Sequence, residues 1–105
     1  MEAPNLDYIK RLSGGDVQFE RKLIEIIKSE FPEEWKTYQS NVESGNLEAA
    51  SQNVHKLKHK FSILGLEQSY DVAVSYETEL KDGKTSLRAD FEVIMRSLAK
   101  YIMSI

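Results

Sequence analysis

The sequence contains no cysteine, only two prolines and five glycines, and no long run of apolar residues. Without cysteine the chain can form neither a disulfide framework nor a thiolate metal site, and this composition suits the cytoplasm, where we expect the protein to act. A membrane-spanning helix needs roughly 18 consecutive apolar residues, and no stretch of this sequence approaches that length. The N-terminal residues MEAPNLDYIK also lack the pattern of a signal peptide, so we expect neither secretion nor a membrane.

The charge balance is mildly negative, with 17 acidic against 14 basic side chains. Such a balance disfavours nucleic-acid binding, for which a strongly basic surface is typical. The length of 105 residues suits one small domain, and 41% hydrophobic and 30% charged residues are typical of globular proteins. We therefore expect a single domain over residues 1–105 that binds no nucleic acid.

Glycines and apolar periodicity divide the sequence into segments of helical length. Apolar residues recur at steps of three and four, and the alternation typical of strands is missing. The segments are Asn5 to Leu12, Asp16 to Gly45, Asn46 to Leu64, Glu67 to about Lys81, and Ser86 to Ser104. The predicted fold class is all-α, an antiparallel up-down-up-down four-helix bundle with a short extra N-terminal helix.

Several residues predict where these helices begin, bend or face the core. Asp16 and Ser86 have side chains suited to the N-cap of the second and fifth segments. Pro32 has no N–H to donate, so it predicts either a kink or two helices in line within the second segment. The apolar stripe of that segment includes Phe19 and Ile26, which predicts that both face the core.

The third segment has the most regular apolar seam. Its members are Leu47, Ala50, Val54, Leu57, Phe61 and Leu64. A helical step of about 100° places His55 roughly 130° from the centre of this seam, so the imidazole is predicted to face solvent near the middle of the bundle. His59 and Ser62 fall on the same outward stripe, and Lys58 falls between that stripe and the seam.

An exposed imidazole on this stripe indicates a specific chemistry. A neutral imidazole has one ring nitrogen with a free lone pair, so histidine can attack a phosphoryl group and carry it covalently. The phosphoryl group then adds nearly two negative charges to the surface. Lys58, one turn from His55, is placed to attract those charges by on the order of 1 to 4 kcal/mol at ~4 Å.

A spaced motif surrounds the histidine: His55, Leu57 and Lys58 lie within four residues, and Gly65 follows the histidine by ten residues. This motif resembles the core of the histidine-containing phosphotransfer (HPt) domains of two-component phosphorelays, which has histidine, leucine, lysine and glycine at these places.

The resemblance extends to both sides of this core. Residues 12–16, followed by Phe19, resemble the opening of the family, and Glu77 matches an acidic residue of its next helix. The similarity therefore covers about residues 6–80, and the helix plan covers the whole chain.

The resemblance implies a phosphorelay intermediate. His55 would accept a phosphoryl group from the aspartyl phosphate of a receiver domain and pass it to another response regulator, and Lys58 would steady that group. Lys56, His59 and Ser62 would belong to the surface that binds the partner. The protein would be a carrier and not an enzyme, without a cofactor, because the partner receiver domain supplies the catalytic groups and Mg²⁺. The expected partners are receiver domains or a hybrid sensor kinase, and the expected state is a monomer.

One position departs from the family pattern. The family usually has glycine four residues after the histidine, whereas this chain has His59, followed by Lys60 and Phe61 in place of small residues. Three interpretations stay open: a partner surface shaped for a larger side chain, a slower relay, or a direct part for His59. Lys56 and Lys60 are also expected to steer an acidic partner, mainly through the association rate.

Two other functions fit parts of the pattern. The bundle could be a noncatalytic adaptor that binds a regulator through the basic face around His55. Alternatively, His55 and His59 form an H-x-x-x-H pair that could supply two ligands to the metal of a hydrolase. Zinc sites take three or four protein ligands, so we expect no metal site.

Overall fold

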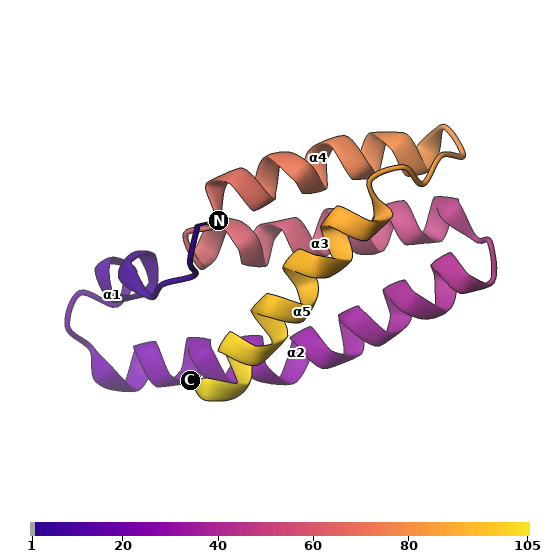
Figure 1. Ribbon diagram of the computed structural model, residues 1–105. Helices are drawn as coiled ribbons and strands as arrows, with labels where there is room; N and C mark the ends of the chain where they lie inside the picture. The colour runs from indigo at the N-terminus through magenta and orange to yellow at the C-terminus, as the bar shows by residue number, and fades with distance from the viewer. Residues whose placement is uncertain (1) are drawn as a thin grey trace.

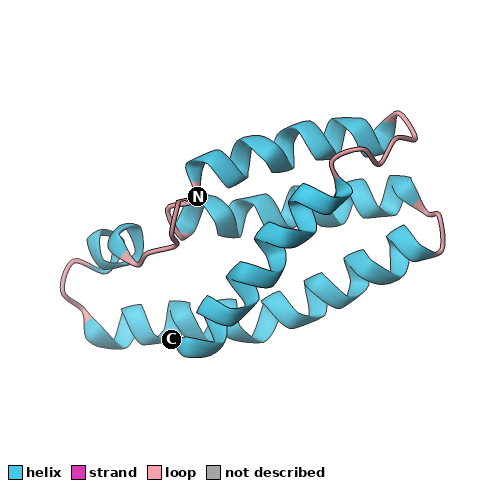
Figure 2. Ribbon diagram, viewed as in Figure 1, coloured by secondary structure: helices cyan, strands magenta, loops and turns pink. Residues whose placement is uncertain are grey.

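The computed structural model describes residues 2–105, which fold into helices joined by short loops (Figure 1; Figure 2). The helices are α1 (Asp7–Ser13), α2 (Val17–Glu43), α3 (Leu47–Ile63), α4 (Glu67–Lys81) and α5 (Arg88–Ser104). No strand occurs within residues 2–105. The prediction of an all-α bundle with a short N-terminal helix is therefore confirmed.

The four long helices surround one core. Figure 1 shows α2 to α5 reversing direction at each short connection, with α5 crossing the others obliquely. α3 packs against α2 and α4, and α5 contacts both α4 and α2. The Phe61 ring of α3 lies 5.9 Å from the Phe91 ring of α5, measured between centroids. The opposite side of α3 therefore faces outward.

The predicted seam of α3 is confirmed as core. Its central residues are fully buried: Ala50, Val54, Leu57, Phe61 and Leu64. A helix of this kind buries its seam because roughly 1.5–3 kcal/mol is gained for each large apolar side chain removed from water. Since the seam fixes the rotation of α3 about its axis, it also fixes which side chains point away from the bundle.

α2 follows the prediction at its start and departs from it further on. The Asp16 side chain accepts a hydrogen bond from the Phe19 N–H at 3.1 Å, which confirms the N-cap. The helix continues through Pro32, so the alternative of two helices in line is wrong. Because Pro32 is exposed, the carbonyl that loses its helical partner there can be hydrated.

The first turns of α2 are less buried than their apolar stripe predicts. Phe19 is 45% exposed and Ile26 is 43% exposed, so the prediction that both face the core is wrong. At Phe19 the reason is length, whereas Ile26 lies on the outer side of a turn whose Ile27 is buried. α2 has 27 residues against 17 in α3 and in α5, and its first turns extend past the ends of those helices to where α1 lies (Figure 1).

The predicted N-cap role of Ser86 is also wrong. α5 begins at Arg88, and no side chain caps it. Instead the Glu79 carboxylate of α4 accepts hydrogen bonds from the Ser86 hydroxyl and, at 2.8 Å, from the Leu87 N–H. Ser86 thus ties the connection to α4 and does not start α5.

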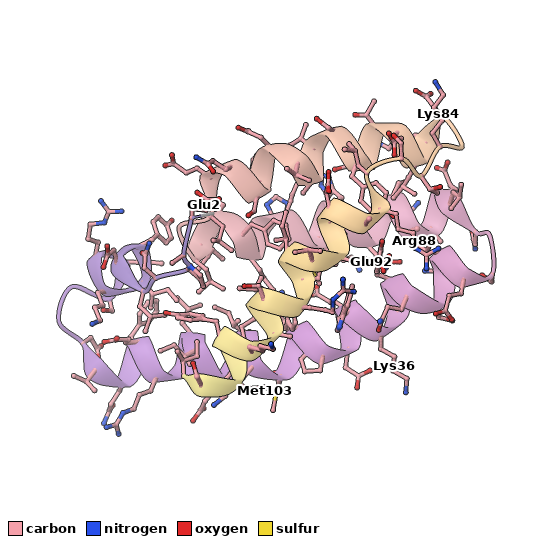
Figure 3. All side chains as sticks on the ribbon, in the orientation of Figure 1. Glu2, Lys36, Lys84, Arg88, Glu92 and Met103 are labelled. Atoms are coloured by element: carbon pink, nitrogen blue, oxygen red, sulfur yellow. The ribbon has the colours of Figure 1, made fainter. Side chains whose placement is uncertain are left out.

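The N-terminal arm closes the turn that sets α3 against α4. At this turn Gly65 has a φ of +77°, and a Cβ there would lie 2.5 Å from the Asn5 amide nitrogen. The Asn5 N–H donates to the Leu64 carbonyl at 2.9 Å, and the Glu2 carboxylate accepts from the Ser69 N–H at 2.7 Å. Figure 3 shows Glu2 beside the first turn of α4. Glycine is required here for both its conformation and its size.

Candidate functional site

His55 projects from the outward side of α3, as the helical step predicts. Its side chain is 54% exposed, and its Nδ1 lies 3.2 and 3.3 Å from the two carboxylate oxygens of Glu77 on α4. A carboxylate accepts hydrogen bonds and donates none, so the neutral ring carries its proton on Nδ1. The Nε2 atom, on the other side of the ring, then has the free lone pair.

Glu77 is the centre of this cluster. It is only 8% exposed, and besides His55 it accepts from Lys58 Nζ at 2.9 Å and from Lys81 Nζ at 3.4 Å. Burial opposes the charged form, but the hydrogen bond and charge of Lys58, with the hydrogen bonds of Lys81 and His55, outweigh it and hold the pKa of Glu77 below its ordinary value. Glu77 is therefore ionised at neutral pH.

Lys58 lies where the sequence predicts, between the outward stripe and the seam. Its side chain is 13% exposed, and its ammonium group lies 5.9 Å from the centre of the Tyr70 ring. Both contacts are to α4, because Glu77 and Tyr70 belong to that helix. Lys58 therefore acts directly on Glu77, and through Glu77 on His55.

The predicted partner-binding residues Lys56, His59 and Ser62 are all exposed. The His59 ring packs edge-on against the His55 ring, with centroids 5.2 Å apart and planes at 88°. Ser62 lies further along α3 and borders a separate depression beside Tyr70. The structure thus brings His59 to His55 and leaves Ser62 apart.

A depression of about 360 Å³ opens beside His55. Its lining residues are Ser51, Gln52, His55, Lys56, Glu77 and Lys81. It has room for a phosphoryl group, and it lies on the outward side of α3 and α4. Lys81 is 55% exposed, so its ammonium group adds positive charge at the edge of this depression.

The sequence analysis named neither the contact of Glu77 with His55 nor Lys81. The signal for Lys81 was its place four residues after Glu77, a spacing at which acidic and basic side chains pair on a helix. The signal for Glu77 was its place between Ala73 and Leu80, both core residues, at steps of four and three. A carboxylate on a core-facing side needs partners, and basic groups of α3 supply them.

The expectation that Lys60 steers a partner is wrong. Its side chain is 9% exposed, and its ammonium group lies 3.2 Å from a Glu30 oxygen and 2.6 Å from a Glu34 oxygen on α2. The angle at Glu34 does not suit a hydrogen bond, so that contact is an ion pair only. Because Lys58 and Lys60 are both engaged with carboxylates, the basic segment presents less positive charge to solvent than its sequence indicates.

Two further findings concern the described part of the chain. Between residues 2 and 105, no three or more histidine and acidic side chains are grouped so that they could hold a metal ion. No helix in the same range combines the length and the apolar character that crossing a membrane requires.

A comparison with protein families gives the class to which this helical bundle belongs. The Hpt domain family matches residues 22–101, well over half of the chain. The chain belongs to the Hpt domain family. Hpt domains are helical bundles that serve as phosphotransfer modules in two-component signalling and interact with receiver domains.

The match also adjusts the extent of the predicted resemblance. It begins inside α2, so residues 12–16 and Phe19 lie outside it, and it continues into α5, beyond the end of the predicted similarity. No curated protein and no solved structure matches the chain.

Proposed function

We propose that the protein is a phosphorelay intermediate. His55 accepts a phosphoryl group from the aspartyl phosphate of a receiver domain and passes it to another response regulator. One observation supports this most strongly: Glu77 holds Nδ1 of His55 at 3.2 Å, which leaves the lone pair on the Nε2 atom of a half-exposed ring. The phosphotransfer function is inferred from the Hpt family, and Nε2 is inferred to be the reactive atom from the contact of Nδ1 with Glu77.

The transfer is a nucleophilic displacement at phosphorus. The Nε2 lone pair of His55 forms the N–P bond while the bond from phosphorus to the aspartyl oxygen breaks, and that electron pair returns to the aspartate carboxylate. The ring becomes positively charged, and its proton stays on Nδ1, where the ionised Glu77 stabilises it. Transfer to the next receiver aspartate is the same step in reverse.

The neighbouring lysines adjust the charge of the site. Lys58 keeps Glu77 ionised and oriented, and it also places positive charge one turn from the phosphoryl group, which steadies that group. Lys81 lines the depression beside His55 and also pairs with Glu77, so it helps to keep that carboxylate ionised. Lys58 and Lys81 thus act on the ring through Glu77.

The expected partners are response-regulator receiver domains or a hybrid sensor kinase in the cytoplasm. In this scheme the protein is a carrier and not an enzyme, and the receiver domain contributes the aspartate, Mg²⁺ and other catalytic groups. Lys56, His59 and Ser62 belong to the docking surface around His55. A monomer suffices, because one exposed imidazole meets one receiver active site at a time.

The test is incubation of the chain with a phosphorylated receiver domain, followed by analysis for acid-labile, base-stable phosphate. Wild type and His59→Gln should become labelled, and His55→Gln should not. A label that survives in His55→Gln would disprove the site assignment. Stable binding of the receiver without any label would instead support the noncatalytic adaptor.

A further inference from the structure

His59 is a hydrogen-bond donor beside His55 that the proposed relay has not yet used. It is exposed, it follows His55 by one turn of α3, and the two ring centroids are 5.2 Å apart. It also occupies the place where the family usually has glycine. A large polar side chain at this place, against the reactive ring, calls for a physical explanation.

The geometry of α3 directs His59 to the side of His55 that carries Nε2. The Nδ1 atom of His55 points to Glu77 on α4, so Nε2 lies on the side of the ring away from α4. A helical step of about 100° turns Lys58 from His55 toward α4 and turns His59 the other way. Helical side chains also lean toward the preceding turn, which brings His59 over His55.

Three of the ammonium groups on α3 and α4 in this part of the bundle are already engaged with carboxylates. Lys58 and Lys81 both contact Glu77, and the buried Lys60 contacts two carboxylates of α2. A phosphoryl group on Nε2 brings nearly two negative charges and three acceptor oxygens. The imidazole of His59 is within contact distance of the ring that carries them, and it forms no ion pair with residues 2–105.

We propose that His59 donates an N–H hydrogen bond to an oxygen of the phosphoryl group carried on His55 Nε2. The inference rests on the proposed function. The oxygens lie two bonds beyond Nε2, which brings them within reach of a ring whose centroid is 5.2 Å from that of His55. The contact makes and breaks no covalent bond. It stabilises the phosphorylated state, so it slows hydrolysis and shifts the transfer equilibrium toward His55.

The half-life of the phosphoryl group on His55 tests the contact. The full chain is labelled by a phosphorylated receiver, separated from it, and followed by phosphate release for wild type, His59→Leu and His59→Gln. Leucine removes the donor and should shorten the half-life about fivefold, as expected for the loss of a charge-assisted hydrogen bond. Glutamine keeps an N–H donor of similar reach, so its half-life should stay within about twofold of wild type.

A matched control separates the effect of the His59 contact from a general effect of surface charge on the half-life. Lys36 is exposed on α2 and does not line the depression beside His55, so Lys36→Gln removes a charge without touching the His55 ring, and its half-life should equal that of wild type. Equal half-lives for wild type and His59→Leu would overturn the proposal. Equal shortening by leucine and glutamine would also overturn it, because side-chain shape would then explain the effect.

The relay and the His59 contact can fail separately. If a phosphorylated receiver leaves the chain unlabelled, the proposed function fails, and phosphoramidate, a small-molecule phosphodonor, then loads the histidine directly. Fragment mass spectrometry in alkaline solution identifies the phosphate on His55, and the same three variants are compared. If the receiver labels His55 but His59→Leu decays at the wild-type rate, the relay stands and the contact with His59 is refuted.

Discussion

Two carboxylates, Glu77 on α4 and Glu92 on α5, each lie at the centre of a cluster of polar contacts. The two clusters have different roles. Glu77 holds His55, whose ring is half-exposed. Glu92 accepts from the Tyr38 hydroxyl at 2.9 Å and from Arg88 Nε at 2.7 Å. Figure 3 shows Arg88 and Glu92 on neighbouring turns of α5, close to α2. One cluster presents a reactive ring to solvent, and the other links helices through a carboxylate that is 18% exposed.

The cluster around Glu92 connects three helices through hydrogen bonds. The hydroxyls of Tyr38 and Tyr76 lie 2.7 Å apart, so Tyr76 donates to Tyr38, which in turn donates to Glu92. Burial raises the pKa of both phenols, which keeps them protonated as donors. Both phenol hydroxyls and Arg88 Nε donate within the bundle, so the cluster joins α2, α4 and α5. The cluster around Glu77 leaves one atom, His55 Nε2, available for chemistry.

The replacement His55→Gln should have the largest effect on function and almost none on the fold. It removes the nucleophile, so labelling by a phosphorylated receiver should fall to background. The side chain is 54% exposed, so the free energy of unfolding should change by less than about 1 kcal/mol. Labelling checks the effect on function, and denaturant unfolding checks the effect on stability. A large loss of stability would show that His55 is structural.

The replacement Glu77→Gln should slow phosphoryl transfer by about tenfold to a hundredfold, the range typical for removing the hydrogen-bond partner of a metal-bound histidine. The amide can no longer neutralise the charge that develops on the ring, and Lys58 loses its ion pair. Rapid-quench measurement of transfer from a phosphorylated receiver gives the rate. An unchanged rate would mean that Glu77 is structural only, like Glu92.

The replacement Tyr38→Phe should give the reverse pattern. It removes the hydroxyl that links Tyr76 to Glu92 and should lower the free energy of unfolding by about 1 to 3 kcal/mol. Phosphoryl transfer should stay within about twofold of wild type, because the cluster does not reach His55. Urea unfolding and the same quench assay make the comparison; a transfer defect as large as that of Glu77→Gln would show that the two clusters are coupled.

Acidic pH should reduce the contribution of the Glu77 cluster to the free energy of unfolding, an effect smaller than those of the three replacements above. The folded state holds the pKa of Glu77 below its ordinary value, so the cluster stabilises the fold above the ordinary carboxyl pKa. That stabilisation is lost as the pH falls through the lower, folded value. The stability gap between wild type and Glu77→Gln should therefore narrow from about pH 5 to about pH 3. Urea unfolding across this range checks it, and a constant gap would contradict the assigned shift.

The replacement Lys56→Gln should have the smallest effect. Lys56 is the exposed lysine of the basic segment, so its removal should lower the association rate with an acidic receiver by less than about threefold. Stopped-flow binding at low and high salt tests this, because steering by an exposed charge weakens with ionic strength. A larger effect that persists in salt would mean a direct contact.

The outward face of α3 was predictable because one seam fixes the rotation of a whole helix. Leu57 and its partners at steps of three and four identified the buried side, and His55 followed from the helical step alone. Asp16 was predictable for a similar reason, since an N-cap acts within its own turn. Features that depend on a single helix could therefore be predicted from the sequence.

Features that depend on a second helix could not be predicted in this way. The burial of Lys60 requires Glu30 and Glu34 of α2 to lie opposite it, and the exposure of Phe19 follows from how far α2 extends past its neighbours. The Ser86 side chain is of a type that caps helices, but its hydroxyl donates to Glu79 on α4 instead. Contacts across the bundle depend on packing distances and relative rotation, which periodicity along one helix does not specify.

Nuclear magnetic resonance of the phosphorylated chain tests the central claim most directly. With ¹⁵N-labelled histidine, phosphorus–nitrogen coupling identifies the ring nitrogen that carries the phosphate after exposure to a phosphorylated receiver. The contact between Glu77 and Nδ1 predicts coupling to Nε2 of His55, with the proton still on Nδ1. Coupling to Nδ1 of His55, or to either nitrogen of His59 alone, would contradict it.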